Sequence, residues 1–314
     1  MSQPNPSTTP FKAEQTFLAY NQTQAKAYVH GRPDYDRKLY DAVLQYHTST
    51  NGQTDTVVDL GCGPGNVARA LAPHFTHALG LDPSPGMVES ARAQGGVSAT
   101  SEPIRYELST AEDFGCHLSP PVADHSVDLI VAANAAHWFD MDRFWATAAR
   151  VLKPGGSVIV WTTGELRCHP DMPNCAAIQT ALDHMQNTEL MPYFNPGNIL
   201  VRTRYAGLVL PWQLETPVPE FDQKTFVHRN WDVGEGFDNE LPEVDLDRYE
   251  TIMDTASMVT RWREAHPEKV GTEEDYVRRC RRTIERLLNE AGVEKGQEKI
   301  KGVMQGAMLI LKRV

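Results

Sequence analysis

Three closely spaced glycines, Gly61, Gly63 and Gly65, stand where the backbone could lie directly against a ligand. The apolar run 56–60 predicts a buried strand before them, and a helical pattern begins after them at Asn66. Glycine has no Cβ, so a ligand can approach such a turn closely, and the first N–H groups of the helix point toward it. The sequence therefore predicts a ligand-binding turn between a strand and a helix.

The spacing of these glycines narrows the kind of ligand. Dinucleotide-binding turns carry a third glycine one residue later, as G-x-G-x-x-G, and Asn66 occupies that position here. The spacing favours S-adenosylmethionine, which has no pyrophosphate to be held. A nicotinamide-dependent oxidoreductase is the disfavoured alternative.

Asp82 is the second element of this predicted site. It ends the next predicted strand, 77–82, about 20 residues beyond the turn, where an acidic side chain can bind both hydroxyls of a ribose. The alternative is that Asp82 caps the proline-containing turn at 83–85. The glycine turn favours ribose binding.

Strands and helices alternate around these residues with short connections. This alternation indicates an α/β fold with a parallel sheet that is covered on both faces. Further on the pattern loosens, and the end of the chain supplies a last strand. Beyond the first two strands, we predict strands at 104–108, 127–133, 157–161, 225–233 and 307–311, and helices at 66–75, 87–93 and 139–152. We also predict one amphipathic helix from Tyr249 to Trp262, another over 276–291, and two helical patterns between Phe11 and His47 that are split at Gly31 to Pro33.

Composition limits the class of protein. A chain of 314 residues with 41% hydrophobic content can form one large α/β domain with a helical subdomain. The formal charge of −11 argues against a broad nucleic-acid surface, and no apolar run approaches the roughly 20 residues of a membrane span. The polar start is unlike a signal peptide, and the five scattered cysteines lack metal spacing, so we expect a cytoplasmic monomer or homodimer that needs no metal.

Three segments resemble the successive motifs of class I S-adenosylmethionine-dependent methyltransferases. They are VDLGCGPG at 58–65, LDPSPGM at 81–87 and LKPGG at 152–156. The resemblance covers about 56–163 and implies a Rossmann-like, seven-stranded sheet whose final strand is antiparallel. We expect this fold to carry an N-terminal helical lid and a C-terminal helical insertion. The expected divisions are a flexible tail at 1–10, lid helices at 11–50, a cofactor-binding core at 51–164, and a substrate-side helical region at 165–314 that completes the sheet.

The same resemblance implies which side chains hold the cofactor. Asp59 is expected to orient the glycine turn and to approach the methionine amino group. Ala111 and Glu112 follow the third strand, where the family contacts adenine, although Glu112 could instead belong to a surface turn. The full set of expected cofactor-binding residues is Asp59, Gly61, Gly63, Gly65, Asp82, Pro83, Met87, Ala111, Glu112, Asn134 and Ala135.

Further segments resemble the trans-aconitate methyltransferase family, especially its fungal branch. They are YVHGRPDY at 28–35, AAHWFD at 135–140, YFNPG at 193–197 and VTRW at 259–262. This resemblance implies O-methylation of a small molecule, either of a carboxylate or of a secondary metabolite. S- or N-methylation of a metabolite and a non-catalytic, regulatory S-adenosylmethionine-binding protein are the alternatives. One departure is Asn198, at a position where the family leads us to expect a basic residue.

His137 and Trp138 follow the fourth predicted strand, at the edge of the sheet where α/β folds bind ligands. Methyl transfer from a sulfonium depends mainly on positioning the acceptor. An ionised carboxylate needs no general base, whereas an alcohol, phenol or thiol can require one. We expect His137 to be catalytic, as a base or as a donor to a substrate oxygen, and Trp138 to contact the substrate. Simple packing is the alternative for both residues.

Positive charge for binding the acceptor comes from outside the predicted core. The neighbouring glycine and proline would hold Arg32 in place, and its guanidinium could pair with a carboxylate through two hydrogen bonds. Its alternative role is a structural bridge to the core. Arg261 on the late helix could add charge over the pocket, although such residues often form a solvated face. Tyr20 and Tyr28 are expected to be substrate-side lid residues.

Overall fold

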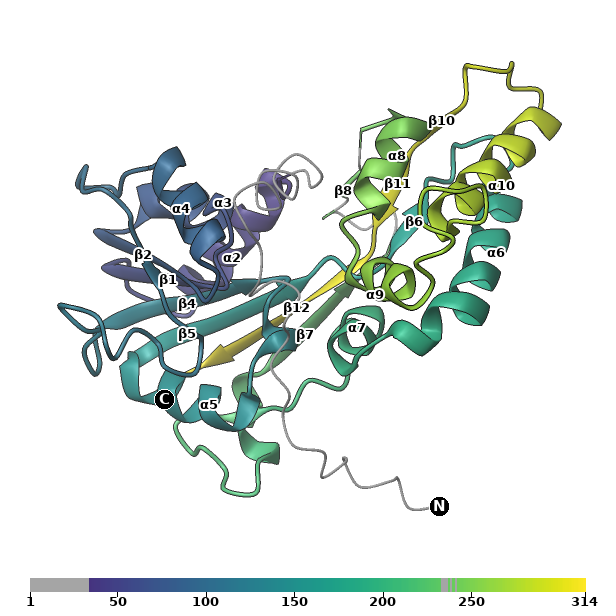
Figure 1. Ribbon diagram of the computed structural model, residues 1–314. Coiled ribbons are helices and arrows are strands. Elements are labelled where there is room, and N and C mark those ends of the chain that lie inside the picture. Colours follow the sequence, from purple (N-terminus) through teal and green to yellow (C-terminus); the bar gives the residue numbers. More distant parts are fainter. Residues whose placement is uncertain (1–33, 233–236, 238, 241) are drawn as a thin grey trace.

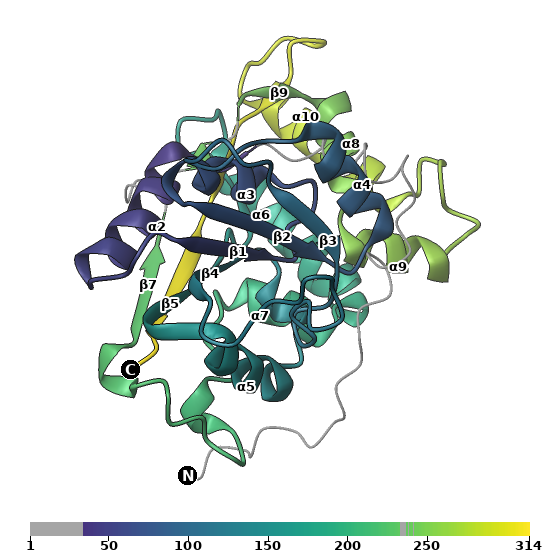
Figure 2. The same cartoon turned by 90° about the vertical axis from the view of Figure 1, so that its left-hand side faces the viewer.

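A seven-stranded sheet forms the centre of the protein, with helices on both of its faces (Figures 1 and 2). The computed structural model describes residues 34–314 apart from 233–236, 238 and 241. The strand order is β3-β2-β1-β4-β5-β12-β7. β12 runs antiparallel to both of its neighbours, and the pairs among the first five strands are parallel. These strands are β1 (Thr56–Leu60), β2 (His77–Asp82), β3 (Arg105–Leu108), β4 (Val127–Ala133), β5 (Leu152–Thr162), β7 (Val227–Trp231) and β12 (Gly306–Lys312).

This arrangement confirms the predicted Rossmann-like sheet with its antiparallel strand. The central strands are apolar on both sides, as is typical of parallel strands covered by helices on both faces. Val57 and Leu129 pack into the core on one face, whereas Val58 and Ile130 pack into the core on the other. Adjacent residues of one strand therefore serve two separate cores, which is why the sequence shows continuous apolar runs here.

Among the described residues, four helices cover the two faces of the sheet. In Figure 1, α2, α3 and α4 lie above the sheet and α5 lies below it. α2 begins after Asp36, whose carboxylate accepts a hydrogen bond from the Lys38 N–H at 2.8 Å. The predicted helix 66–75 is shorter than expected, because a 3-10 turn at Ala72–His74 that contains Pro73 follows it. The bounds are α2 (Arg37–Ser49), α3 (Asn66–Leu71), α4 (Pro85–Gln94) and α5 (Met141–Val151).

A second, largely helical layer lies beyond the carboxyl ends of the parallel strands (Figure 1). Most of it is inserted between β5 and β12, and it has its own core, which includes Ile178, Trp262 and Ile284. Two small sheets, β6-β11-β8 and β10-β9, tie it together. Its helices are α6 (Cys175–Met185), α7 (Pro196–Arg202), α8 (Leu246–Met253), α9 (Ser257–Ala265) and α10 (Tyr276–Glu290). Its strands are β6 (Leu166–Cys168), β8 (Asn239–Glu240), β9 (Val244–Asp245), β10 (Lys299–Ile300) and β11 (Gly302–Met304).

The prediction of one helix from Tyr249 to Trp262 is wrong. The chain forms α8 and α9, and between them a tight turn in which the Ala256 N–H bonds to the Met253 carbonyl at 3.0 Å. Ala256 has extended backbone angles, so the first helix cannot continue through it. The apolar periodicity persists because Met253 and Ala256 still pack against the second-layer core. Within the described ranges, no helix is both long and apolar enough to cross a membrane.

Candidate active site

The glycine turn follows β1 and leads into α3, as predicted. Gly61 has a φ of 64°, and a Cβ there would lie 2.6 Å from the Cβ of Ala135. Gly65 leaves room for the Tyr106 ring, which a Cβ would meet at 2.7 Å. Gly63 differs from both, because its φ is 53° and a Cβ would meet no described atom within 4 Å. Gly61 and Gly65 are therefore required by packing, whereas the backbone at Gly63 borders open space that a ligand can use.

Asp82 holds the glycine turn from the neighbouring strand. Its Oδ2 accepts a hydrogen bond from the Gly63 N–H at 2.9 Å, and its Oδ1 accepts one from the Ser84 N–H at 2.8 Å. Burial raises the pKa of Asp82 to about 6, and the two N–H donors partly offset this effect. The side chain thus caps the following turn, as the alternative reading expected, and also lies at the turn expected to bind the cofactor.

Asp59 is buried under the same turn with half of its carboxylate unused. Oδ2 accepts a hydrogen bond from the Ala68 N–H at 3.1 Å, and Oδ1 is buried with no hydrogen-bond partner among the described residues. Burial raises the pKa of Asp59 to about 8. A buried polar atom without a partner is costly, so a ligand that supplies a cation or an N–H donor fits this position. These features fit S-adenosylmethionine. The expected partner of Asp59 is the amino group of that cofactor, the expected partners of Asp82 are its ribose hydroxyls, and the open space is at Gly63.

The other expected cofactor residues are spread around this turn. Met87 is buried on α4, and Pro83 is half-buried at the end of β2. Ala111 is buried after β3, while the Glu112 carboxylate accepts a hydrogen bond from the Asp140 N–H at 2.7 Å. Glu112 therefore links this loop to the start of α5. The contact of Ala111 and Glu112 with adenine stays a prediction.

Asn134 lies just after β4 and ties that strand to the end of β5. Its Nδ2 donates hydrogen bonds to the Tyr35 hydroxyl at 3.0 Å and to Thr163 Oγ1 at 2.9 Å. Its Oδ1 accepts hydrogen bonds from Thr162 Oγ1 and from the Thr163 N–H, both at 3.0 Å. Since the amide is engaged on both sides by the protein, any contact with the cofactor would come from the backbone of this residue.

His137 lies in the short 3-10 turn Ala136–Trp138, beyond the carboxyl end of β4. Its Nδ1 lies 2.9 Å from the hydroxyl of Tyr205, a buried residue that follows α7. The Trp138 ring packs on α7 as well, since a Cβ on Gly197 would lie 2.4 Å from it. The structure thus joins His137 and Trp138 to the second layer, at the edge of the sheet that carries the glycine turn.

Arg261 on α9 reaches the beginning of α7. Its Nε donates a hydrogen bond to the Tyr193 carbonyl at 2.8 Å, and its Nη2 donates to Asn198 Oδ1. Asn198 is buried in a capping box with Asn195, so an amide suits this position better than a long cation. The positive charge next to this residue comes from Arg261 instead.

Three predicted substrate-side residues, Tyr20, Tyr28 and Arg32, lie outside the described residues. Conversely, Tyr205, Thr162 and Gly197 belong to this region and were not predicted. Tyr205 sits in a turn with a positive φ of 61° and carries no motif that would mark it. Thr162 and Gly197 stand inside segments that sequence analysis identified, but only the contacts show what they do.

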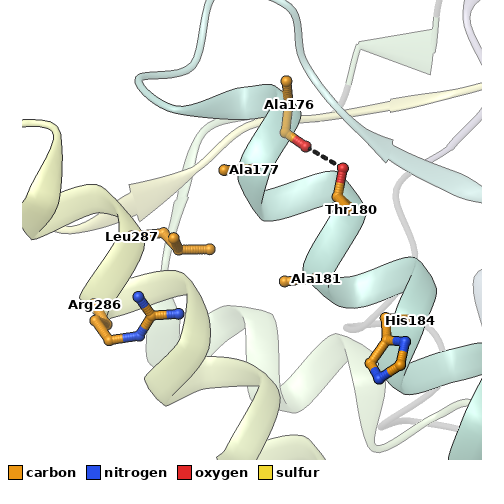
Figure 3. Close-up of a pocket in the computed structure, with 7 residues that line it drawn as sticks. All are labelled: Ala176, Ala177, Thr180, Ala181, His184, Arg286 and Leu287. Atoms are coloured by element: carbon orange, nitrogen blue, oxygen red, sulfur yellow. Dashed lines mark hydrogen bonds between the residues drawn. The ribbon is translucent and has the colours of Figure 1, made fainter.

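One further groove lies between α6 and α10, far from the glycine turn (Figures 1 and 3). It has a volume of about 580 Å³ and is lined mainly by small side chains of α6. Arg286 borders it and pairs with Glu290 on its own helix. No predicted cofactor or substrate residue lines the groove.

Among the residues that the structure describes, no three His, Cys, Asp or Glu side chains gather as a metal site.

The order of the strands, the antiparallel β12 and the acidic ends of β1 and β2 are those of a class I methyltransferase fold. A solved structure from Anaeromyxobacter dehalogenans, described as a type II methyltransferase, has the same fold, with a TM-score of 0.58 and 23% identity. That match covers 90% of this chain and 97% of the other.

Residues 58–160 match the family model described as a methyltransferase domain. This segment runs from β1 to β5 and contains the glycine turn, Asp82 and His137. Over residues 58–160 the chain is therefore similar to methyltransferase domains, and the cofactor that goes with this similarity is S-adenosylmethionine.

Two relatives show how far the sequence similarity extends. A Dictyostelium discoideum protein described as a methyltransferase is 31% identical over 163 residues, which are 52% of this chain and 54% of the relative. A Saccharomyces cerevisiae protein described as an S-adenosylmethionine-dependent methyltransferase is 27% identical over 130 residues, or 41% and 42% of the two chains. The chain thus spans about half the length of these curated relatives.

Proposed function

We propose that the protein transfers the methyl group of S-adenosylmethionine to an oxygen of a small-molecule acceptor. The observation that carries this proposal is the pair of buried carboxyl groups at the glycine turn, since Asp82 accepts from the Gly63 N–H and Asp59 accepts from the Ala68 N–H. Asp59 Oδ1 has no described partner, and the backbone at Gly63 borders open space. Both features match a ligand with an amino group and a ribose.

Each residue of the site has a defined task in this proposal. Bound S-adenosylmethionine supplies an electrophilic methyl group on a sulfonium. Asp82 binds the ribose hydroxyls while it keeps the Gly63 N–H in place, and Asp59 binds the amino group. His137 and Trp138 form the side of the site where the acceptor enters. Positioning the acceptor in line with the methyl carbon and excluding water account for most of the rate acceleration.

We infer that the acceptor carries a carboxylate. Arg261 supports this inference, because its guanidinium is held at Asn198, next to the Gly197 on which Trp138 packs. The resemblance to trans-aconitate methyltransferases at 28–35, 135–140, 193–197 and 259–262 supports it as well. In such an acceptor the methyl group could go to the carboxylate itself or to a hydroxyl on the same molecule.

The remaining expectations follow from charge and fold. With a net charge of −11, we expect no nucleic-acid or membrane partner, a cytoplasmic location, and a monomer or homodimer. Transfer to sulfur or nitrogen and non-catalytic binding of the cofactor are the competing functions. They predict, respectively, a different product and no product at all.

A panel of hydroxy acids, carboxylic acids, phenols, thiols and amines, assayed with a labelled methyl donor, tests the proposal. We expect transfer to an oxygen of a carboxylate-bearing compound, with the methylated atom identified by mass spectrometry of the product. Calorimetry with S-adenosylhomocysteine and with NAD provides the control. Binding of NAD without binding of S-adenosylhomocysteine would overturn the proposal, as would binding without transfer to any acceptor of the panel.

A further inference from the structure

Three buried polar atoms without a hydrogen-bond partner lie at the carboxyl edge of the sheet. In the described part of the chain, four buried side-chain nitrogen or oxygen atoms make no hydrogen bond, and three of them are Asp59 Oδ1, Ser84 Oγ and Trp161 Nε1. Asp59 is near the end of β1, Ser84 follows β2, and Trp161 is near the end of β5. Buried polar atoms are nearly always paired, so three unpartnered atoms at one edge indicate that a ligand binds there.

Asp59 and Trp161 lie on the same face of the sheet. Side chains alternate along a strand, and the residues two positions earlier, Val57 and Ile159, both belong to the core that packs against α2 and α3. Trp161 belongs to this core as well, and the Asp59 carboxylate accepts its hydrogen bond from the Ala68 N–H of α3. Both side chains are therefore on the face that α2 and α3 cover.

The register of the strands sets the separation of these two residues. Asp59 lies beside Val131 on β4, Val131 lies beside Ile159 on β5, and Trp161 is two residues closer to the carboxyl edge. With about 4.8 Å between strands and about 3.3 Å per residue, the two Cα atoms are roughly 12 Å apart. The β4 residue beside Trp161 is Ala133, which is half-buried, so β4 places only a methyl group between the two side chains.

The two unpartnered atoms have opposite hydrogen-bonding character. Asp59 Oδ1 can only accept when the carboxyl group is ionised, whereas the Trp161 indole N–H can only donate. A ligand that satisfies both must present a donor to Asp59 and an acceptor to Trp161 over a short distance. An α-amino acid has this pattern, because its ammonium and its carboxylate are attached to the same carbon atom. S-adenosylmethionine ends in such a group.

We propose that the amino-acid end of S-adenosylmethionine lies over the end of β4, with its ammonium on Asp59 Oδ1 and its carboxylate on the Trp161 indole N–H. This inference rests on the proposed function, which assigns the amino group to Asp59, and it adds a residue that binds the carboxylate. The Tyr35 ring packs against the indole at 82°, with ring centroids 5.7 Å apart, and supports its orientation. Asp59 and Trp161 are both buried, so the two charged hydrogen bonds form away from water, where such bonds are strong.

The indole N–H reports on this contact without any methyl acceptor. In protein labelled with ¹⁵N-tryptophan, the Trp161 signal is assigned by its loss in Trp161→Phe, and a hydrogen bond to a carboxylate moves an indole proton downfield. We expect S-adenosylmethionine to produce this shift. Decarboxylated S-adenosylmethionine keeps the ammonium and the sulfonium but has no carboxylate, and it should leave the signal near its ligand-free position. Equal shifts with both ligands, or no shift with saturating S-adenosylmethionine, would overturn the inference.

Calorimetry with the same two ligands separates the two side chains. Trp161→Phe should lower the affinity for S-adenosylmethionine about 10-fold or more, within the range of charged hydrogen bonds, and should leave that for the decarboxylated ligand within about 2-fold. Asp59→Asn should weaken the binding of both ligands, because both carry the ammonium. Trp231→Phe removes another buried indole from the same core and is the matched control, with an affinity for S-adenosylmethionine like that of the wild type.

The outcomes distinguish this inference from the proposed function. If Trp161→Phe weakens both ligands equally, or neither of them, Trp161 serves the core alone and the inference is wrong, whereas methyl transfer by the wild type still supports the proposed function. Failure of the proposed function would instead appear as no methyl transfer to any acceptor by a protein whose Trp161 signal shifts as expected.

Discussion

Oδ2 of Asp82 accepts a hydrogen bond from the Gly63 N–H at 2.9 Å, so the end of β2 holds the glycine turn that follows β1. The two segments are thus linked before any ligand arrives. A carboxylate that is already oriented by backbone donors loses little freedom when it binds a ligand, which favours affinity. Asp82 therefore supports the turn, and the proposed function gives it a second role as a binding group.

Replacing Asp82 by alanine should weaken S-adenosylhomocysteine binding by about 1–3 kcal/mol, because charge-assisted hydrogen bonds to the ribose are lost. Isothermal titration calorimetry measures this change. Asp124→Ala is a suitable control, since Asp124 is an exposed carboxylate paired with Arg150. Equal affinity of wild type and Asp82→Ala would remove Asp82 from the cofactor site.

Two glycine substitutions should separate packing from ligand space. Gly61→Ala adds a Cβ within 2.6 Å of Ala135 and should destabilise the folded protein. Gly63→Ala meets no described atom within 4 Å, so its cost to folding should be limited to about 1–2 kcal/mol for the left-handed backbone. Thermal unfolding and cofactor titration check the pair. We expect Gly63→Ala to lose most of the binding while it stays folded, and retention of wild-type affinity would mean that the cofactor does not occupy the open space at Gly63.

Stability should fall with rising pH because of the two buried carboxyl groups. Their pKa values, about 6 for Asp82 and about 8 for Asp59, lie above that of an exposed aspartate, near 4. Between these values the folded chain binds more protons than the unfolded chain, so the free energy of unfolding decreases from about pH 4 to about pH 8. Urea unfolding of the ligand-free protein across this range measures the trend.

Asp59→Asn should remove much of that trend, since an amide carries no charge to bury. We expect this variant to be more stable than the wild type at pH 8, by an amount on the order of a few kcal/mol, and to bind S-adenosylhomocysteine less tightly. In the wild type, affinity should rise between pH 6 and pH 8 as Asp59 ionises. A pH-independent affinity would mean that Asp59 does not contact the amino group.

His137→Ala should slow methyl transfer far more than it weakens cofactor binding. General acid–base groups contribute about 10²–10⁴-fold to rates, whereas His137 makes no described contact with the glycine turn. Single-turnover rates and S-adenosylhomocysteine affinity, measured on the same preparation, provide the comparison. The reverse pattern, weak binding with a normal rate at saturation, would make His137 part of the cofactor pocket.

Arg261→Gln should raise KM for a carboxylate acceptor, with kcat/KM lower by about 10–100-fold, because a charged hydrogen bond contributes about 1.5–3 kcal/mol. The corresponding amide of the same acceptor should show little difference between the wild type and the variant. This comparison isolates charge recognition from the support that Arg261 gives to Tyr193 and Asn198. Equal losses for acid and amide would assign Arg261 to structure alone.

Sequence analysis predicted the sheet well because its strands are apolar runs bounded by turn residues. The glycine turn, Asp82 and His137 could be proposed as site residues because each stands at the end of such a run. Sequence analysis missed Tyr205 and Thr162, since their contacts with His137 and Asn134 join distant segments that no local pattern records. The break between α8 and α9 escaped for a related reason, because Ala256 keeps its place in the apolar repeat while its backbone leaves the helix.

The position of β12 has a consequence for how the chain is made. β5 pairs on one side with β12, which is synthesised only after the whole second layer has followed. Until residues 306–312 leave the ribosome, that side of β5 is an open strand edge with unpaired N–H and C=O groups and apolar side chains, the kind of surface on which chains aggregate. The vulnerable period of this protein is therefore the translation of its helical layer, and slowing synthesis there should increase its demand for chaperones.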